Sequence, residues 1–178
     1  ADAIPSSPGE EVLLPGTDGH LRILSANGQL LADWPVSSGA LTCAAAGTNS
    51  TGETRILTGG VDGVLYAFEP NGTSAGTISP LSAPSFLTHV VVGNFDGQGG
   101  DEIMLFFSIA SLNQMVDCFD LDALDGSRPS FWNATSFLQN NLLDLGYLRT
   151  SPFAYDMDGD GKDEVVGPWG ILRPEEAW

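Results

Sequence analysis

Residues 156–164 read Asp-Met-Asp-Gly-Asp-Gly-Lys-Asp-Glu, and this stretch indicates both a metal loop and the fold that carries it. Oxygen donors recur at alternate positions, which converge while the residues between them turn outward, and Gly161 at position 6 permits the sharp turn. This spacing suits calcium, which takes about 6–8 oxygen ligands at about 2.3–2.6 Å. The expected ligands are Asp156, Asp158, Asp160, Lys162 (through its carbonyl) and Glu164.

The sequence after this loop predicts a strand. A helical calcium-binding motif would carry a bidentate glutamate at position 12 of the loop, where this chain has Gly167, and Val165-Val166 begin a β-type run. The competing interpretation is a solvated acidic turn. It is disfavoured because three aspartates so close together repel one another when no cation lies between them.

The composition indicates one all-β domain. The chain has 178 residues, 42% of them hydrophobic, which is enough for a sizeable core. Its 22 glycines and 11 prolines favour many turns between short strands.

The charge of the chain excludes several classes of partner. Six Lys and Arg residues stand against 23 Asp and Glu, for a net charge of −17. Nucleic acid and anionic membranes need a basic patch, which six scattered cations do not form. No apolar run approaches the roughly 18 residues of a membrane span, and no signal peptide is present, so we expect no membrane span.

Cysteines and glycosylation motifs favour an extracellular or cell-surface location. Cys43 and Cys118 lie in strand-like runs, and the sequence leaves open whether they form one disulfide or remain two buried thiols. Asn49, Asn71 and Asn133 each begin an N-x-Ser/Thr acceptor triplet in a turn-like setting, where we expect exposure and a glycan.

Two hairpins repeat along the chain. Residues 12–28 and 56–72 share Gly, Asp-Gly, Leu and Asn-Gly positions at one offset of 44 residues. Each predicts a strand, an Asp-Gly turn, a second strand and an Asn-Gly turn. This spacing matches a propeller blade, whose repeat is about 40–50 residues.

The metal loop also repeats, 62 residues earlier in the chain. The second loop has fewer charges, which predicts weaker cation binding, and its expected ligands are Asn94, Asp96, Gln98, Gly100 (through its carbonyl) and Glu102. Residues 47–53 have lost most of the acids and are expected to form an empty turn. Residues 8–12 resemble the tail of another loop, whose beginning we expect before residue 1.

We therefore predict a single repeat domain over residues 1–178, with blades at about 9–40, 41–82, 83–147 and 148–178. The third blade carries an insertion at 126–148, with a short helix expected over 136–145. The fourth is truncated and the first lacks a full inner strand, so the ring is incomplete in this chain and leaves an open sheet edge. The expected strands are 41–46, 55–59, 64–69, 76–79, 88–94, 102–108, 114–121, 152–156 and 164–167.

Residues 151–167, with their Asp-x-Asp-Gly-Asp-Gly loop and following Glu-Val-Val-Gly, closely resemble the FG-GAP/VCBS repeat of integrin-α-like β-propellers. The hairpin at 62–72 is similar to those of VCBS and quinoprotein-type blades. The resemblance implies four-stranded antiparallel blades whose first two strands are joined by a calcium loop. Gln98 departs from the pattern in the second loop.

No catalytic motif stands out, and no nucleophile elbow, Cys-x-x-Cys or phosphate loop occurs in the sequence. We expect a non-enzymatic, extracellular, calcium-stabilised propeller segment that serves adhesion, scaffolding or a surface filament. A protein partner or copies of the chain itself would complete the open edge, and carbohydrate is a further candidate partner. The alternative is the propeller domain of a secreted carbohydrate-active enzyme similar to polysaccharide lyases, or a quinoprotein-like enzyme.

Overall fold

The computed structural model describes residues 3–79, 85–109, 113–122, 124, 151–167 and 170–173. These residues form 13 strands and no helix, in four antiparallel sheets, which confirms the predicted all-β class. The predicted insertion at 126–148 and its helix lie outside the described residues. Among the described residues there is no long apolar helix of the kind that spans a bilayer.

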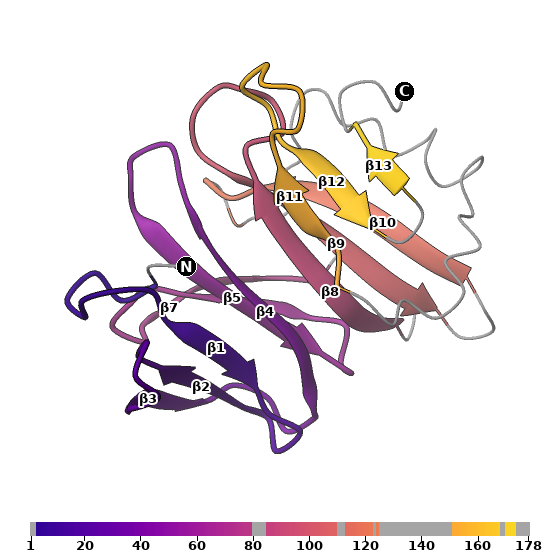
Figure 1. Ribbon diagram of the computed structural model, residues 1–178. Coiled ribbons are helices and arrows are strands. Elements are labelled where there is room, and N and C mark those ends of the chain that lie inside the picture. The colour runs from indigo at the N-terminus through magenta and orange to yellow at the C-terminus, as the bar shows by residue number, and fades with distance from the viewer. Residues whose placement is uncertain are drawn as a thin grey trace.

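Each sheet is built from one continuous stretch of chain (Figure 1). The first sheet contains β1 (Val12–Pro15), β2 (His20–Leu24) and β3 (Leu30–Pro35). The second contains β4 (Leu41–Thr48), β5 (Thr54–Gly60), β6 (Leu65–Phe68) and β7 (Ser74–Ile78). The third contains β8 (Ser85–Gly93), β9 (Glu102–Ile109) and β10 (Asn113–Asp120), and the fourth β11 (Phe153–Tyr155), β12 (Glu164–Gly167) and β13 (Gly170–Leu172).

The predicted strands are found within three residues at either end, and β12 has the predicted bounds. The two repeated hairpins also take the same shape. Gly19 and Gly63 follow the aspartate of each Asp-Gly turn with φ of 80° and 71°, a conformation that favours glycine. Each of these glycines donates its N–H to the carbonyl three residues earlier, at 3.1 Å.

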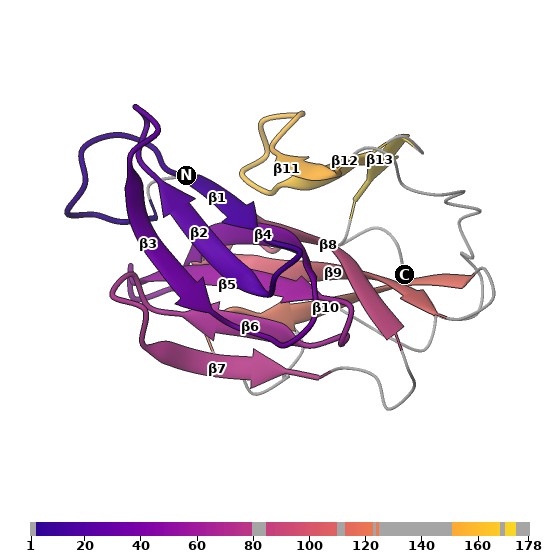
Figure 2. The ribbon, with the colours of Figure 1, turned by 90° about the horizontal axis from the view of Figure 1, so that it is seen from below.

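The sheets stack face to face in chain order. The first strands contact one another in succession, β1 with β4, β4 with β8 and β8 with β11, and the first and fourth sheets lie at the two ends of the row (Figures 1 and 2). Three apolar clusters fill the junctions between neighbouring sheets. The described sheets do not close into a ring. The second sheet has four described strands, and each of the other three sheets has three.

The continuous apolar run in β9 follows from this stacking. Ile103, Leu105 and Phe107 belong to the cluster shared with the second sheet, whereas Met104 and Phe106 belong to the cluster shared with the fourth. All five are fully buried. Successive side chains of a strand point to opposite faces, so a strand between two neighbouring sheets is apolar at every position.

Candidate metal centre

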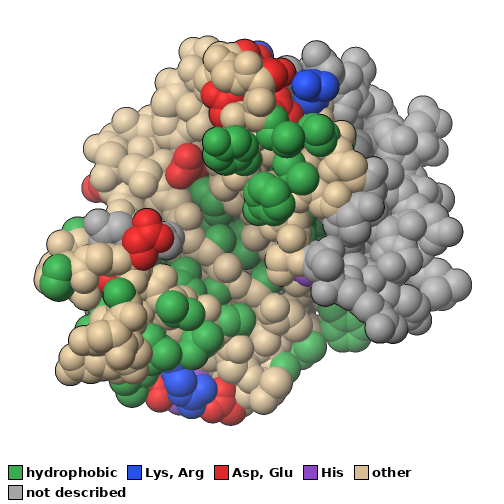
Figure 3. Space-filling view, in the orientation of Figure 1, with side chains coloured by type: hydrophobic (Ala, Val, Ile, Leu, Met, Phe, Trp, Pro, Cys, Tyr) green, Lys and Arg blue, Asp and Glu red, His purple; other side chains and the backbone are tan. Residues whose placement is uncertain are grey.

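The loop 156–164 connects β11 to β12 and brings three of its acids together. One carboxylate oxygen from each of Asp156, Asp158 and Glu164 lies within 4.8 Å of the other two. Asp160 does not belong to this group of three. Figure 3 shows the acidic side chains gathered at the end of the molecule that the β11–β12 loop occupies in Figure 1. All-oxygen donors converging at this distance fit a hard cation such as calcium.

The fold of the loop depends on its aspartates accepting main-chain N–H groups. Asp156 Oδ1 accepts from Gly159 at 2.7 Å, and its Oδ2 accepts from Gly161 at 3.1 Å. Asp160 Oδ1 accepts from the N–H of Lys162 at 2.9 Å. These local bonds replace strand pairing and wind the loop back on itself, which is why short acidic side chains occur at alternate positions.

Glu164 closes the loop from the strand side. Its side chain is buried, and Oε2 accepts the N–H of Met157 at 2.8 Å. The guanidinium of Arg173 lies just beyond β13, with Nη2 3.3 Å from Asp158 Oδ2 and Nε 3.7 Å from Glu164 Oε1. One cationic side chain therefore faces two of the three acids, a contact that sequence reasoning missed because no motif links residue 173 to the loop.

The second predicted loop, between β8 and β9, repeats the same bonds. Asn94 Oδ1 accepts from Gly97 at 2.8 Å, Asp96 Oδ1 from Gln98 at 2.7 Å, and Glu102 Oε2 from Phe95 at 2.7 Å. The Gln98 side chain is exposed. The pKa of the Glu102 carboxyl is raised to about 7, chiefly by burial; the bond from Phe95 lowers the pKa, and the nearby Asp96 and Asp120 carboxylates raise it. A cation in this loop would remove that penalty.

A third glutamate plays the same part near the N-terminus. Glu11, just before β1, is buried, and its Oε2 accepts the N–H groups of Ala3 at 2.8 Å and Ile4 at 3.1 Å. We expected the start of this loop before residue 1. The segment that closes onto Glu11 instead lies within the described residues.

Two aspartates that were not predicted link neighbouring loops. Asp163 Oδ2 accepts the N–H of Asn94 at 2.9 Å, while the N–H of Asp163 donates to the carbonyl of Asn94 at 2.8 Å. Asp101 makes the same pair of bonds with Thr48, at 2.6 and 2.8 Å. We call each pair a clasp, because it fixes the loop of one sheet to the chain at the end of the first strand of the preceding sheet, at Thr48 in β4 or at Asn94 just after β8. The only sequence signal is the acid directly before Glu102 and Glu164.

The remaining predicted sites lie apart from these loops. Asn49 is buried and its Nδ2 donates to Glu53 Oε2 at 3.1 Å, so the expected exposure of this glycan acceptor is wrong. Asn71 is exposed, and Asn133 lies outside the described residues. Cys43 and Cys118 are buried free thiols. Burial raises the pKa of Cys43 to about 12 and that of Cys118 well above its usual value.

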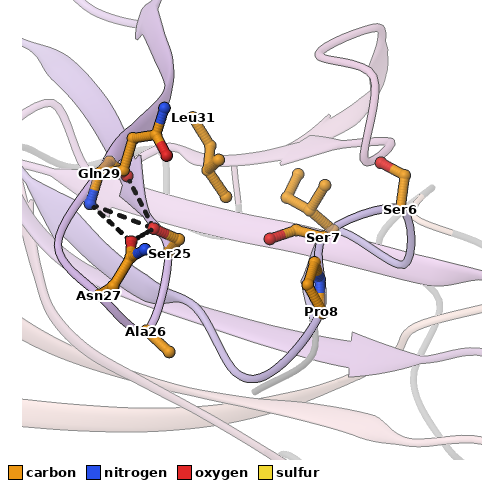
Figure 4. A pocket seen from close by; sticks show the side chains of 9 residues that line it. Ser6, Ser7, Pro8, Ser25, Ala26, Asn27, Gln29 and Leu31 are labelled. Carbon is orange, nitrogen blue, oxygen red and sulfur yellow. Dashed lines mark hydrogen bonds between the residues drawn. The ribbon is translucent and has the colours of Figure 1, made fainter.

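A pocket of about 600 Å³ lies between the N-terminal segment and the β2–β3 turn (Figure 4). Its polar lining is uncharged. Within it Ser25 Oγ, Asn27 Oδ1 and the main chain of Gln29 bond to one another. None of the predicted metal ligands lines it.

Comparison with known proteins gives no assignment: no protein-family model matches the chain, and no curated protein matches it. The residues of the loops and the packing of the sheets are therefore the features that indicate a function.

Proposed function

We propose that this chain is a calcium-stabilised repeat protein of the FG-GAP/VCBS type, in which the four sheets are propeller blades. It acts outside the cell without catalysis, in adhesion, scaffolding or a surface filament. Its partners are another protein or copies of itself that complete the open end of the stack, with carbohydrate as a further candidate.

The observation that carries this proposal is the convergence of Asp156, Asp158 and Glu164 within 4.8 Å in a loop whose sequence has calcium spacing. The equivalent bonds in the loop 94–102 support it, because the same winding occurs twice at the same place in successive sheets. The contact of successive first strands supports the assignment of the sheets as blades.

The proposed role of calcium is structural. The ion would be held by Asp156, Asp158 and Glu164, with Asp160 and the carbonyl of Lys162 as further donors. Bound there, it would neutralise a group of three carboxylates that otherwise has only the Arg173 guanidinium, beside Asp158 and Glu164, as the counter-charge described above. Because the unfolded chain has no such site, the free energy of binding adds to the free energy of folding. Glu164 is both a ligand and the first residue of β12, so binding would fasten the start of that strand to the loop.

The test is thermal unfolding with and without calcium, combined with elemental analysis of the purified protein. At calcium 100 times the Kd, the expected stabilisation is about 2.7 kcal/mol. For a chain of this size it corresponds to a rise in Tm of roughly 5–11 °C. Asp158→Asn should remove most of this rise. Glu69→Gln takes one charge from a turn outside the loops and should leave the rise unchanged. Protein that contains no calcium and whose Tm is the same in calcium and EDTA would refute the proposal.

A further inference from the structure

Arg173 faces the two loop oxygens that the main chain does not use. Both carboxylate oxygens of Asp156 accept main-chain N–H groups, and so do Asp158 Oδ1, 3.3 Å from the Asp160 nitrogen, and Glu164 Oε2. Within the described part of the chain, Asp158 Oδ2 and Glu164 Oε1 accept no main-chain N–H. The Arg173 guanidinium lies 3.3 Å from the first of these oxygens and 3.7 Å from the second. The guanidinium thus lies against the oxygens that are most open to a metal ion.

The arginine reaches these oxygens because of its place in the sheet. Leu172 is the last residue of β13 and pairs with Val165, the second residue of β12. The residue that follows Leu172 therefore stands beside Glu164, the first residue of β12. The side chain of Arg173 is 38% exposed and that of Glu164 is 1% exposed. The guanidinium therefore gives a counter-charge to a carboxylate that solvent hardly reaches, and such a carboxylate is costly to bury without one.

The loop of the third sheet has an acid at the same position. Its glutamate, Glu102, begins β9 as Glu164 begins β12, and the residue opposite Glu102 on the third strand of that sheet is Asp120. Asp120 thus stands where the fourth sheet has Arg173, although the two loops share the same main-chain bonds. The winding of the loop therefore does not require an arginine, and a different role accounts for it in the loop 156–164.

A calcium ion bound to the same oxygens would lie close to the guanidinium. Calcium binds carboxylate oxygens at about 2.3–2.6 Å, so an ion on Asp158 Oδ2 would lie within about 6 Å of Arg173 Nη2. Like charges at that distance repel each other, and arginine does not lose its proton in proteins. The ion and the guanidinium therefore compete for the same two carboxylates.

We propose that Arg173 is a built-in counter-cation of the loop 156–164, which binds Asp158 and Glu164 in the calcium-free protein and weakens the binding of calcium. The inference rests on the role of calcium in the proposed function, and it concerns the range of calcium concentration in which the loop responds. Without the ion, the arginine holds the acids together and the loop keeps its winding. When calcium binds, the guanidinium leaves both oxygens.

The test is the Kd for calcium, measured by isothermal titration calorimetry at one pH and one salt concentration; the site is identified by its loss in Asp158→Asn. Arg173→Gln should bind calcium about tenfold more tightly, since two ion-pair contacts no longer oppose the ion. Arg173→Lys keeps the positive charge and should bind nearly as the original chain does. Arg22→Gln is the matched control, because the Arg22 guanidinium also faces two acids, Asp18 at 2.6 Å and Asp33 at 3.4 Å, outside the loops. Its Kd should be unchanged.

Thermal unfolding gives a second measurement. In EDTA, Arg173→Gln should have a lower Tm than the original chain, because the acids of the loop lose their counter-charge. In saturating calcium the Tm of Arg173→Gln should return close to that of the original chain, since the ion then neutralises the same acids. A loss of Tm of equal size in both buffers would overturn the inference, because it would make Arg173 a residue of structural packing alone.

The calorimetry separates this inference from the calcium proposal on which it rests. If the original chain binds calcium and Arg173→Gln binds it equally well or more weakly, the role of Arg173 is refuted and the calcium proposal stands. If neither chain binds calcium, both proposals are refuted. Binding by Arg173→Gln but not by the original chain would support the role of Arg173 and refute stabilisation of the original chain by calcium.

Discussion

Asp163→Ala should destabilise the protein by removing one bond of the clasp between the third and fourth sheets. The carboxylate of Asp163 accepts the Asn94 N–H at 2.9 Å, and a hydrogen bond to a charged group contributes about 1.5–3 kcal/mol. Asn94 is half-buried, so water can reach part of its N–H after the change. The expected loss is therefore at the lower end, about 1.5–2 kcal/mol, or roughly 3–8 °C in Tm.

The matched variant is Asp163→Asn, which keeps an oxygen acceptor at the same place and removes only the charge. Its expected loss is below about 1 kcal/mol. Both variants are compared with the original chain by urea unfolding, followed by far-UV circular dichroism, once in calcium and once in EDTA. The clasp bonds protein to protein, so the loss should be of similar size in both buffers.

Two results would refute this reasoning. Equal losses for the alanine and asparagine variants would show that the acceptor oxygen is not what stabilises the junction. A loss that occurs in calcium and vanishes in EDTA would show that Asp163 acts through the cation. Asp101→Ala removes the equivalent bond to Thr48 at the preceding junction and should cost a similar amount.

Three further predictions concern packing, protonation and the thiols. Gly93→Ala should cost about 1–3 kcal/mol in urea unfolding, because its Cβ would lie 2.7 Å from Ala154 Cβ; an unchanged stability would contradict close packing of the third and fourth sheets. The pKa of Glu102 is about 7 in the folded protein against 4.5 for the free side chain, so between these values the folded state holds a proton that the unfolded chain has lost. In EDTA, the free energy of unfolding should therefore fall as pH rises from about 5 to 7. Glu102→Gln should reduce this dependence on pH. An equal dependence in the variant would show that another group causes it. Cys43 and Cys118 should not react with a thiol reagent in the native protein and should both react after denaturation; a denatured protein without free thiols would indicate a disulfide.

The strands could be predicted from the sequence because their signals are local. Alternating apolar residues and Asp-Gly or Asn-Gly turns fix a hairpin within about 20 residues, and β12 has the bounds that its Glu-Val-Val-Gly run predicts. The same holds for the winding of the loop 156–164, whose bonds join residues at most seven apart. β13 was not predicted, since a strand of three residues gives too short a pattern.

Features that depend on neighbouring sheets could not be predicted. Asp163 has the same place in the loop sequence whether its carboxylate faces water or accepts the main-chain N–H of Asn94. Only the position of the third sheet decides between these two environments. Arg173 reaches Asp158 because β13 returns beside β12. Asn49 has the sequence of an exposed turn, but its side-chain oxygen accepts the N–H groups of Thr51 and Glu53, which draws it inward.

The assembly of every sheet from one uninterrupted stretch of chain has a consequence for biosynthesis. None of the described strands pairs with a strand of another sheet, so each of these sheets can form its hydrogen bonds while the next is still being translated. Each folded sheet then provides an apolar face on which the next sheet packs. Duplication or deletion of the gene segment that encodes one sheet would lengthen or shorten the row of sheets without changing the strand pairing within the other sheets.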